Sequence, residues 1–265
     1  MSTAAFAVLL VVAVCAAFGP WITPQDPFAQ DPLNSASAPG DGHLLGTDQL
    51  GRDVFSLLIA ATRTAVLGPI VVAVLCMLVG ATLGLLGAYF GGVMDTAVNR
   101  FADLIYALPA LLIAIVVIGV VDGGYWLTAA ILTFLTLPYQ IRLCRSVGIV
   151  QVRLPYVDAA RTLGIPAWRT MFRHILPNIS PTVVATGLLD FVTALIGYTS
   201  LSYLGLGGGA EQPDWGTMLN EGQAFITENP WLSLAPVIML VLTAASVTLV
   251  GDWAYDRLSV KGITR

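Results

Sequence analysis

Few side chains in this 265-residue sequence could carry out chemistry, and their spacing builds no catalytic or metal-binding motif. The only histidines, His43 and His174, are far apart, so neither a metal cluster nor a Ser-His pair can be built from them. Ser200 and Ser202 have no candidate base within sequence reach. The one lysine, Lys261, does not follow a glycine, so the sequence lacks the GxxxxGK[ST] phosphate loop. We expect no enzyme activity, no catalytic residue, no metal and no cofactor in this chain.

The composition indicates a membrane protein. The chain is 57% hydrophobic and 11% charged, with 12 Lys+Arg and 16 Asp+Glu, and its mean hydropathy is +0.82. Soluble domains carry about 25% charged residues, so this chain could not cover a surface exposed to water. The composition therefore argues against a soluble enzyme, a nucleic-acid-binding protein and a disordered protein.

Long uncharged runs predict an all-α, polytopic membrane protein with a single domain over 1–265. A helix needs about 20 apolar residues to cross a bilayer. The uncharged runs predict six transmembrane helices, two outer loops at 22–62 and 206–230, and a cytoplasmic loop at 145–178. The six spans are 3–21, 64–89, 104–121, 125–144, 179–205 and 231–251. The first run lacks the basic segment of a secretory signal, so we expect it to remain as a span.

The distribution of basic residues predicts the orientation. Ten of the twelve, six of them in or beside the loop 145–178, fall on one side of the predicted spans, and only Arg52 and Arg63 fall on the other. Cytoplasmic loops carry the excess of Lys and Arg, so both termini are expected in the cytoplasm. The ten are Arg100, Arg142, Arg145, Arg153, Arg161, Arg169, Arg173, Arg257, Lys261 and Arg265.

The arginine-rich loop reads as two helices joined by a tight turn. Pro155 suits the first turn of a helix, and Asp158 in that turn favours the positive end of the helix dipole. Gly164 fits a left-handed C-terminal position, and Pro166 stops continuation. A second helix is expected from Pro166 to about Leu176.

The surface of the first helix allows two interpretations. Ala159 and Ala160 are small, which would let a partner approach closely, and Tyr156 and Leu163 add apolar surface beside Arg161. The same pattern suits an amphipathic helix lying on anionic lipid. From the residues alone, docking of a partner and contact with lipid remain equally open.

The loop also resembles a known motif. Asp158-Ala159-Ala160, followed by Gly164 and by His174-Ile175-Leu176-Pro177, is similar to the EAA loop of binding-protein-dependent ABC importer permeases. Four further segments resemble motifs of the dipeptide, oligopeptide and nickel importers, and their order resembles the C-type membrane subunit of that class. They are 43–54 (HLLGTDQLGRDV), 87–92 (GAYFGG), 200–207 (SLSYLGLG) and 215–222 (WGTMLNEG).

This resemblance implies a type I ABC-importer permease fold in a prokaryotic cell membrane. It implies a sister B-type permease, two ATPase subunits that use ATP and Mg, and an extracytoplasmic binding protein that delivers a di- or oligopeptide. The loop would then be a coupling helix that docks on an ATPase subunit through Tyr156, Asp158, Ala159, Ala160, Arg161, Leu163 and Gly164. The sequence departs from the class where Asp158 replaces the usual Glu and where Tyr198 replaces a common glutamate.

Two features within the spans have open roles. Asp190 is the one acid predicted deep in a span, where it could line the translocation path, together with Tyr198, or form a hydrogen bond at a helix contact. Small residues spaced by four could pack against another helix of this chain or against the sister permease. These residues are Gly80, Gly84, Ala88 and Gly92.

A different class of transporter remains the alternative function. A secondary transporter or channel would act without ATPase partners, and such proteins often show internal repeats and several charges within the membrane. This sequence has no convincing repeat and only Asp190 as a charge deep in a span.

Overall fold

A computed structural model describes residues 2–40, 42–121, 124–207 and 213–263, and the regular elements in this part of the chain are all helices. The helices are α1 (Ser2–Ile22), α2 (Val54–Leu75), α3 (Ala81–Phe90), α4 (Gly92–Tyr106), α5 (Ala110–Val121), α6 (Tyr125–Val152), α7 (Pro155–Thr162), α8 (Ala167–Arg169), α9 (Leu176–Tyr203), α10 (Trp215–Gly222) and α11 (Trp231–Ile263). Among the described residues, two π-helical turns interrupt the α-helices, Cys76–Gly80 between α2 and α3 and Thr170–Ile175 between α8 and α9. In the same part of the chain, two 3-10 turns lie at Pro32–Asn34 and Gln223–Phe225.

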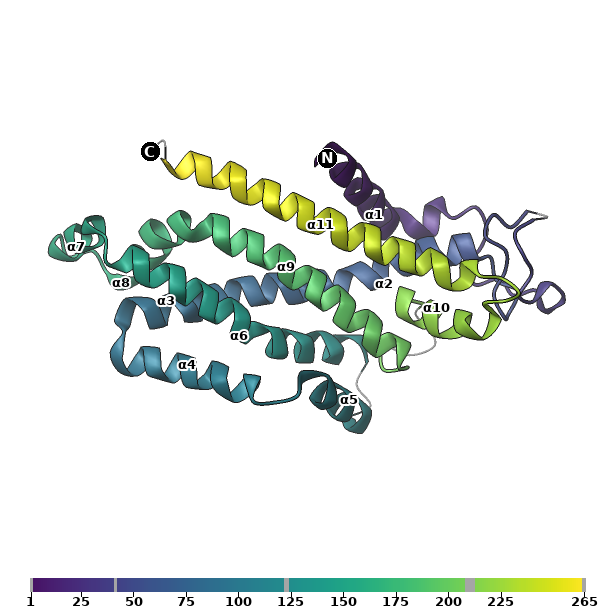
Figure 1. Cartoon of the computed structure of the whole chain (residues 1–265), viewed down its shortest axis with the longest axis horizontal. Helices are drawn as coiled ribbons and strands as arrows, with labels where there is room; N and C mark the ends of the chain where they lie inside the picture. Colours follow the sequence, from purple (N-terminus) through teal and green to yellow (C-terminus); the bar gives the residue numbers. More distant parts are fainter. Residues whose placement is uncertain (1, 41, 122–123, 208–212, 264–265) are drawn as a thin grey trace.

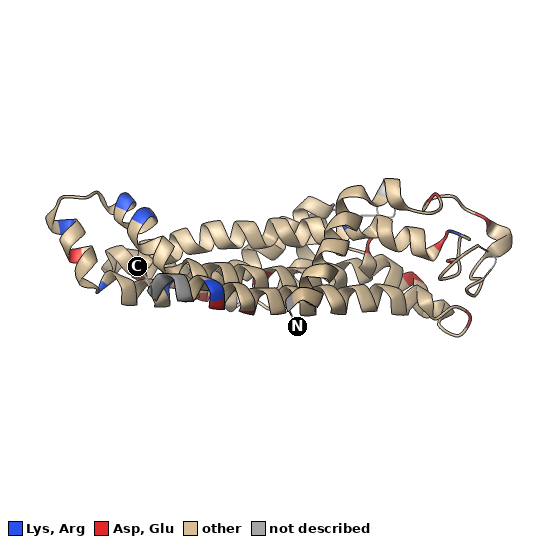
Figure 2. Cartoon of the chain, turned by 90° about the horizontal axis from the view of Figure 1, so that it is seen from above, with Lys and Arg blue, Asp and Glu red and all other residues tan. Residues whose placement is uncertain are grey.

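The long helices run side by side along the long axis of the molecule (Figure 1). Helix α9 contacts α2, α6 and α11, while α1 packs on α2 and α11. In the view of Figure 1, α4 and α5 lie on the opposite side of the bundle from α1 and α11. Figure 2 shows that most charged residues lie near the two ends of this bundle, which leaves the middle for a bilayer.

Four helical stretches are long and apolar enough to cross a membrane. They are Val54–Phe90, Tyr125–Val152, Ala167–Tyr203 and Trp231–Ser259. A stretch of 37 residues, such as the first or third, is about 56 Å long, whereas the hydrocarbon core measures about 30 Å. These helices therefore extend beyond the core, which is why they exceed the uncharged ranges. The apolar Thr3–Gly19 is shorter, so the count of six spans stays a prediction.

The expected continuous helix over 104–121 is not observed. Helix α4 ends at Tyr106 and α5 begins at Ala110, with a bend of 76° between them. Pro109 lies at the break; it has no N–H to donate, and proline disfavours a helical conformation at the residue before it. The two helices form either one broken span or a re-entrant segment.

The expected end of the second loop helix before Pro177 is also not observed. The helix continues from Ala167 to Tyr203. The π-helical turn at Thr170–Ile175 precedes Pro177, which occupies the first turn of α9. A change in hydrogen-bond register can accommodate a residue without an N–H, so the proline does not interrupt the helix.

Three predicted regions lie partly outside the described residues. Residue 41 belongs to the predicted outer loop 22–62. Residues 208–212 belong to the predicted outer loop 206–230, and Arg265 belongs to the predicted basic tail.

Small residues allow close contact between the second half of the first long stretch and α6. A Cβ atom on Gly80 would lie 2.6 Å from Cγ of Gln140, and one on Gly84 would lie 2.7 Å from the carbonyl oxygen of Ile141. Gly92 does not share this face: it opens α4 with a φ of +50°, and a Cβ there would meet nothing within 4 Å. Gly80 and Gly84 thus pack against α6 of this chain, whereas Gly92, the last of the four predicted packing residues, lies beyond the end of α3.

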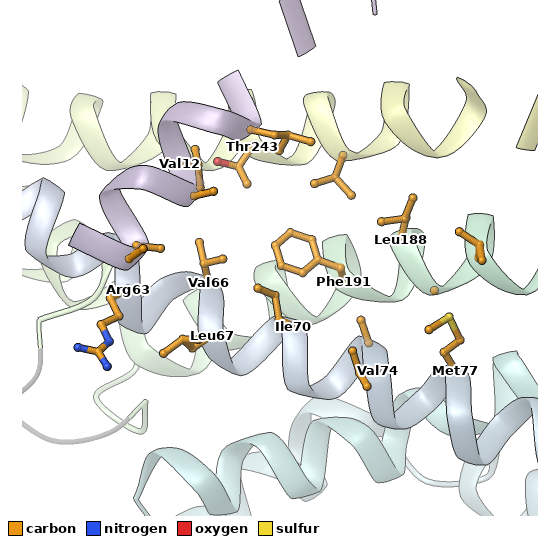
Figure 3. A pocket seen from close by; sticks show the side chains of 18 residues that line it. Val12, Arg63, Val66, Leu67, Ile70, Val74, Met77, Leu188, Phe191 and Thr243 are labelled. Carbon is orange, nitrogen blue, oxygen red and sulfur yellow. The ribbon is translucent and has the colours of Figure 1, made fainter. Parts of the chain in front are cut away.

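A groove of about 650 Å³ is lined by α1, α2, α9 and α11 (Figure 3). Its lining is almost entirely apolar, and includes Val12, Val66, Ile70 and Phe191. Arg63 lies at one end of the row of lining side chains, and Thr243 is the polar side chain labelled on its α11 wall. Such a lining suits hydrocarbon better than a polar solute.

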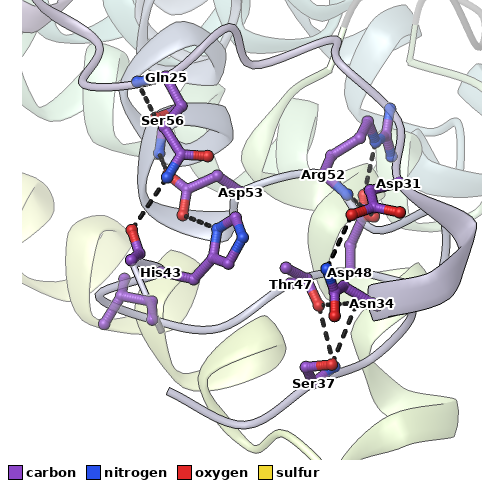
Figure 4. A network of polar contacts seen from close by, with 12 residues as sticks. Gln25, Asp31, Asn34, Ser37, His43, Thr47, Asp48, Arg52, Asp53 and Ser56 are labelled. Carbon is purple, nitrogen blue, oxygen red and sulfur yellow. Dashed lines mark hydrogen bonds and ion pairs between the residues drawn. The ribbon is translucent and has the colours of Figure 1, made fainter. Parts of the chain in front are cut away.

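The segment that precedes α2 is held by a network of buried acids (Figure 4). Asp48 accepts hydrogen bonds from the backbone N–H groups of Leu50 and Arg52, and pairs with Nε of Arg52 at 2.5 Å. Nη2 of Arg52 reaches Oε2 of Glu221 on α10 at 3.2 Å. The motifs 43–54 and 215–222 are therefore joined by an ion pair.

The cap of α2 is Asp53 rather than Thr47 or Asp48, which precede it in the loop. Its carboxylate accepts a hydrogen bond from the N–H of Ser56 at 2.8 Å and contacts Nδ1 of His43 at 3.0 Å. Thr47 instead hydrogen-bonds within the loop, to Asn34 and Ser37. Helix α2 thus begins at Val54, ten residues before the predicted span 64–89, and the residues ahead of it form turns.

Helix α10 begins with a capping box. The carboxylate of Asp214 accepts hydrogen bonds from the N–H groups of Gly216 and Thr217, and the Thr217 hydroxyl contacts the backbone of Asp214 in return. Burial raises the pKa of Asp214 above its usual value, although these hydrogen bonds lower it. The folded chain therefore holds this proton more tightly than the unfolded chain does. The resulting contribution to stability is present at low pH and is lost as the pH rises through the raised pKa.

Adding one methyl group should destabilise the chain at the close helix contact but not at an open surface. Gly84→Ala should destabilise the chain by about 1–3 kcal/mol, because the methyl group meets α6. Gly119→Ala on α5, where a Cβ meets nothing within 4 Å, should leave stability unchanged or raise it, because alanine favours the helix. Thermal unfolding of the detergent-solubilised variants measures this difference. Equal melting temperatures would contradict the close contact.

Replacing Asp214 by Ala or by Asn should distinguish the stability that its helix cap contributes from the effect of its buried charge. Asp214→Ala should lose about 1–2 kcal/mol of stability, because the cap acceptor is removed. Asp214→Asn keeps an acceptor and removes the buried charge, so at pH 7 it should equal or exceed the wild type. The advantage of Asp214→Asn should shrink on acidification, as the wild type gains its proton. An advantage that grew on acidification would contradict the raised pKa.

Candidate functional site

The arginine-rich loop forms a helical hairpin at one end of the molecule, where α7 lies beyond the ends of α6 and α9 (Figure 1). Pro155 is in the first turn of α7, after Leu154 in an extended conformation. The carboxylate of Asp158 lies 3.5 Å from Nη1 of Arg161, both exposed. Gly164 has a φ of +69°, the left-handed conformation in which glycine ends helices. The short helix and its glycine turn are thus present as local structure.

One face of α7 is anchored to the bundle. Val157 is fully buried and belongs to the same apolar cluster as Met171 and Ile175, which lie at the start of the long helix that becomes α9. Ala160 is also buried, and its carbonyl oxygen accepts a hydrogen bond from the N–H of Ile165. The hairpin and the base of α9 therefore form one packed unit.

The opposite face of α7 is exposed. Asp158 and Ala159 face solvent, and the side chain of Leu163 is 78% exposed. Arg161 is exposed too, and its guanidinium lies 4.9 Å from the ring centroid of Tyr89 at the end of α3. Of the two alanines, only Ala159 is thus available to a partner.

Tyr156 braces the hairpin rather than facing outward. Its hydroxyl donates to Oε1 of Gln151 at 2.9 Å and accepts from Nδ2 of Asn178 at 3.3 Å. It therefore connects the end of α6 to the first turns of α9.

Trp168 adds to the exposed surface but was not among the predicted site residues. Its side chain is 60% exposed, and the guanidinium of Arg169 lies over its ring. A large aromatic residue beside Pro166, in a loop rich in arginine, was the available signal. Exposed tryptophan beside arginine is typical of protein interfaces.

Asp190 is separate from the hairpin and lies midway along α9, between Leu176 and Tyr203. Its side chain is 2% exposed, and Oδ2 is buried with no hydrogen-bond partner among the described residues. The residue lines a cavity of about 620 Å³ between α9, α6 and the α4–α5 pair. A carboxylate without a partner in such a place is costly unless a ligand or a proton neutralises it.

Tyr198 does not line that cavity. It is buried two turns further along α9, where its hydroxyl donates to the carbonyl oxygen of Tyr125 at 2.8 Å. The ring packs against α2, because a Cβ on Gly68 would lie 2.5 Å from it. The structure therefore does not bring Asp190 and Tyr198 together in one cavity, and Tyr198 links α2, α6 and α9.

Comparisons with known proteins agree with this architecture. A family model for the binding-protein-dependent transport system inner membrane component matches residues 80–261. A second model, for the N-terminal TM domain of oligopeptide transport permease C, matches residues 1–39. Together the two matches cover most of the chain.

Curated relatives match along almost the whole chain. The glutathione transport system permease protein GsiD of Pectobacterium atrosepticum is 34% identical over 96% of this chain and 84% of its own length. The di/tripeptide transport system permease protein DppC of Pseudomonas aeruginosa is 31% identical, covering 96% of this chain and 86% of that protein. The dipeptide transport system permease protein DppC of Haemophilus influenzae is 30% identical, with coverages of 96% and 88%.

A solved structure supports the fold. The inward-facing MetNI methionine ABC transporter contains a chain that matches with a TM-score of 0.60, covering 76% of this chain and 96% of that chain. At 18% sequence identity this similarity concerns the fold alone. The all-helical membrane architecture, the family match and the relatives lead to one conclusion: this chain belongs to the inner membrane components of binding-protein-dependent transport systems.

Proposed function

We propose that this chain is the C-type permease subunit of an ATP-driven importer of di- or oligopeptides. It forms the translocation path together with a sister B-type permease, and an extracytoplasmic binding protein delivers the peptide. Two separate ATPase subunits bind ATP and Mg, since this sequence has no phosphate loop. The names of the relatives, which are peptide and glutathione permeases, support this class of substrate.

The observation that carries the proposal is the exposed hairpin around α7. Leu163 and Trp168 present apolar surface beside Asp158 and Arg161 at the arginine-rich end of the bundle. In this proposal the arginine-rich end is cytoplasmic because cytoplasmic segments carry the excess of arginine, and the hairpin and both termini then face the side where ATP is available. The exposed face of α7 is the docking surface for an ATPase subunit in this proposal.

The packing below α7 supports a role in coupling. Val157 packs in one cluster with Met171 and Ile175, and the helix from Ala167 to Tyr203 is continuous. A displacement of α7 by the ATPases would therefore move α9 as a rigid body. Rigid-body movement of packed elements is a common way to change the accessibility of a site.

A secondary transporter would not need this docking surface, so co-purification of ATPase subunits distinguishes that alternative from the proposed importer. Leu163→Ser should weaken co-purification of the ATPase subunits by about tenfold, because an apolar contact is lost from the interface. Leu33→Ser is the matched control, since Leu33 is 95% exposed in the loop at the other end. Neither change should alter the melting temperature of the chain. ATPase recovery equal in both variants would count against the docking surface.

The glycine turn tests coupling itself. Gly164→Leu should permit insertion but abolish peptide uptake per ATP hydrolysed, because the turn strains and the bulky side chain meets the partner. Gly205→Leu is the control: Gly205 also follows a helix, with a φ of +80° and no atom within 4 Å of a Cβ. Both variants should lose about 1–2 kcal/mol of stability from the left-handed conformation. Uptake in Gly164→Leu equal to that of the control would contradict the coupling assignment.

A further inference from the structure

The cavity beside Asp190 has the position and the chemistry of a ligand site at the middle of the membrane. Asp190 is 14 residues from Leu176 and 13 residues from Tyr203, the two ends of α9. At 1.5 Å per residue, about 20 Å of helix lie on either side of it. No other acidic or basic residue occurs between 174 and 210, so the carboxylate is the only formal charge on this helix.

The carboxylate lacks the partners that a structural acid would have. Oδ2 of Asp190 has no hydrogen-bond partner among the described residues, although the side chain is almost completely buried. Other acids of the chain differ: Asp48 and Asp53 accept backbone N–H groups, and Asp95 pairs with Arg145. An acid placed to stabilise helix packing would be expected to have such partners.

A basic residue that contacts the cavity lining, Arg142, is already paired with an acid. Arg142 follows Tyr139 on α6 by one turn, and its guanidinium lies 4.5 Å from the ring centroid of Tyr106. Nη2 of Arg142 is paired with Oδ1 of Asp103 at 2.5 Å. This pairing leaves Asp190 as the unbalanced charge of the cavity, so the site selects for a cation.

The cavity is large enough for a small peptide and offers polar contacts around the acid. Its volume of about 620 Å³ lies within the range of sites for small organic ligands. Apart from Asp190 and four other polar residues, the lining is apolar, and an apolar lining would accept peptide side chains of varied shape. The polar lining residues besides Asp190 are Tyr106, Thr136, Tyr139 and Thr193.

The apolar groove between α1, α2, α9 and α11 does not offer the same chemistry. It contains no acidic residue, and Arg63 is the only charged residue of its lining. A cationic group entering that groove would lose its hydration without gaining a counter-ion, which is unfavourable.

We infer that the cavity is a transient binding site for the protonated amino group of the transported peptide, with the carboxylate of Asp190 as its counter-ion. This inference rests on the proposed function, since it names the substrate group that the permease itself contacts. Asp190 would bind the ammonium by charge and hydrogen bond, while the tyrosine and threonine side chains surround it. Peptides whose amino group is blocked would lack this contact.

Cysteine labelling in the complete importer, reconstituted in vesicles, tests the site without depending on transport. Thr193→Cys places a thiol on the exposed part of the cavity lining, in a background with Cys15→Ser because Cys15 is partly exposed while Cys76 and Cys144 are buried. The rate of modification is measured with a cationic and with an anionic methanethiosulfonate reagent. Each rate measurement is repeated with Gly-Leu or with N-acetyl-Gly-Leu present as a protecting ligand.

With Asp190 present, the cationic reagent should react on the order of tenfold faster than the anionic one. Gly-Leu should protect the thiol at a concentration about tenfold lower than N-acetyl-Gly-Leu does. Asp190→Asn should abolish both differences. Asp252→Asn, which removes an exposed acid from α11 outside the cavity, should abolish neither.

Two results would overturn the inference. One is a ratio of reagent rates that Asp190→Asn leaves unchanged, and the other is equal protection by the free and the acetylated peptide with Asp190 in place. Failure of the proposed function is read separately, as a wild-type importer that takes up no peptide when ATP is supplied. The labelling rates report the charge and the ligand preference of the cavity whether or not such uptake occurs.

Discussion

The poor solvation of charge in the hydrocarbon core is the constraint on which the rest of this structure depends. Most charged residues lie near the two ends of the bundle, and the apolar stretches between them are helical. Where arginines enter α6, acids of α4 neutralise them: Arg142 pairs with Asp103, and Arg145 pairs with Asp95. Asp190 is the exception, and the cost of burying it without a partner is what makes its position informative.

Features that depend on local backbone chemistry could be predicted from the sequence. Pro155 at the start of α7 and Gly164 just after its end follow from the dihedral angles that these residues prefer. The bounds of the spans could not be predicted in the same way. Uncharged runs indicate which residues avoid water, but hydrogen bonding decides where a helix continues. The predicted helix over 104–121 therefore breaks at Pro109 inside an apolar run, whereas the helix that becomes α9 continues through Pro177.

The direction of side chains was the second feature that the sequence left open. Ala159 and Ala160 are neighbours of the same type, yet Ala159 is exposed and Ala160 is buried against the bundle. Tyr198 has the sequence context of a path residue, but its hydroxyl binds Tyr125 at a helix contact. Gly92 keeps the four-residue spacing of the packing stripe, but the helix has already ended at Phe90. In each case tertiary contacts, rather than residue type, decide the outcome.

The two walls of the Asp190 cavity differ in a way that suits alternating access. One wall is α9, which continues from the base that packs against α7; Ile175 and Asp190 are 15 residues apart, or about 22 Å along one helix. The other wall includes Tyr106 and Ala110, which lie on either side of the 76° break between α4 and α5. A push on the hairpin would carry the first wall as a rigid body, while the break uncouples the second. The cavity would then change shape at mid-membrane without any change inside α9.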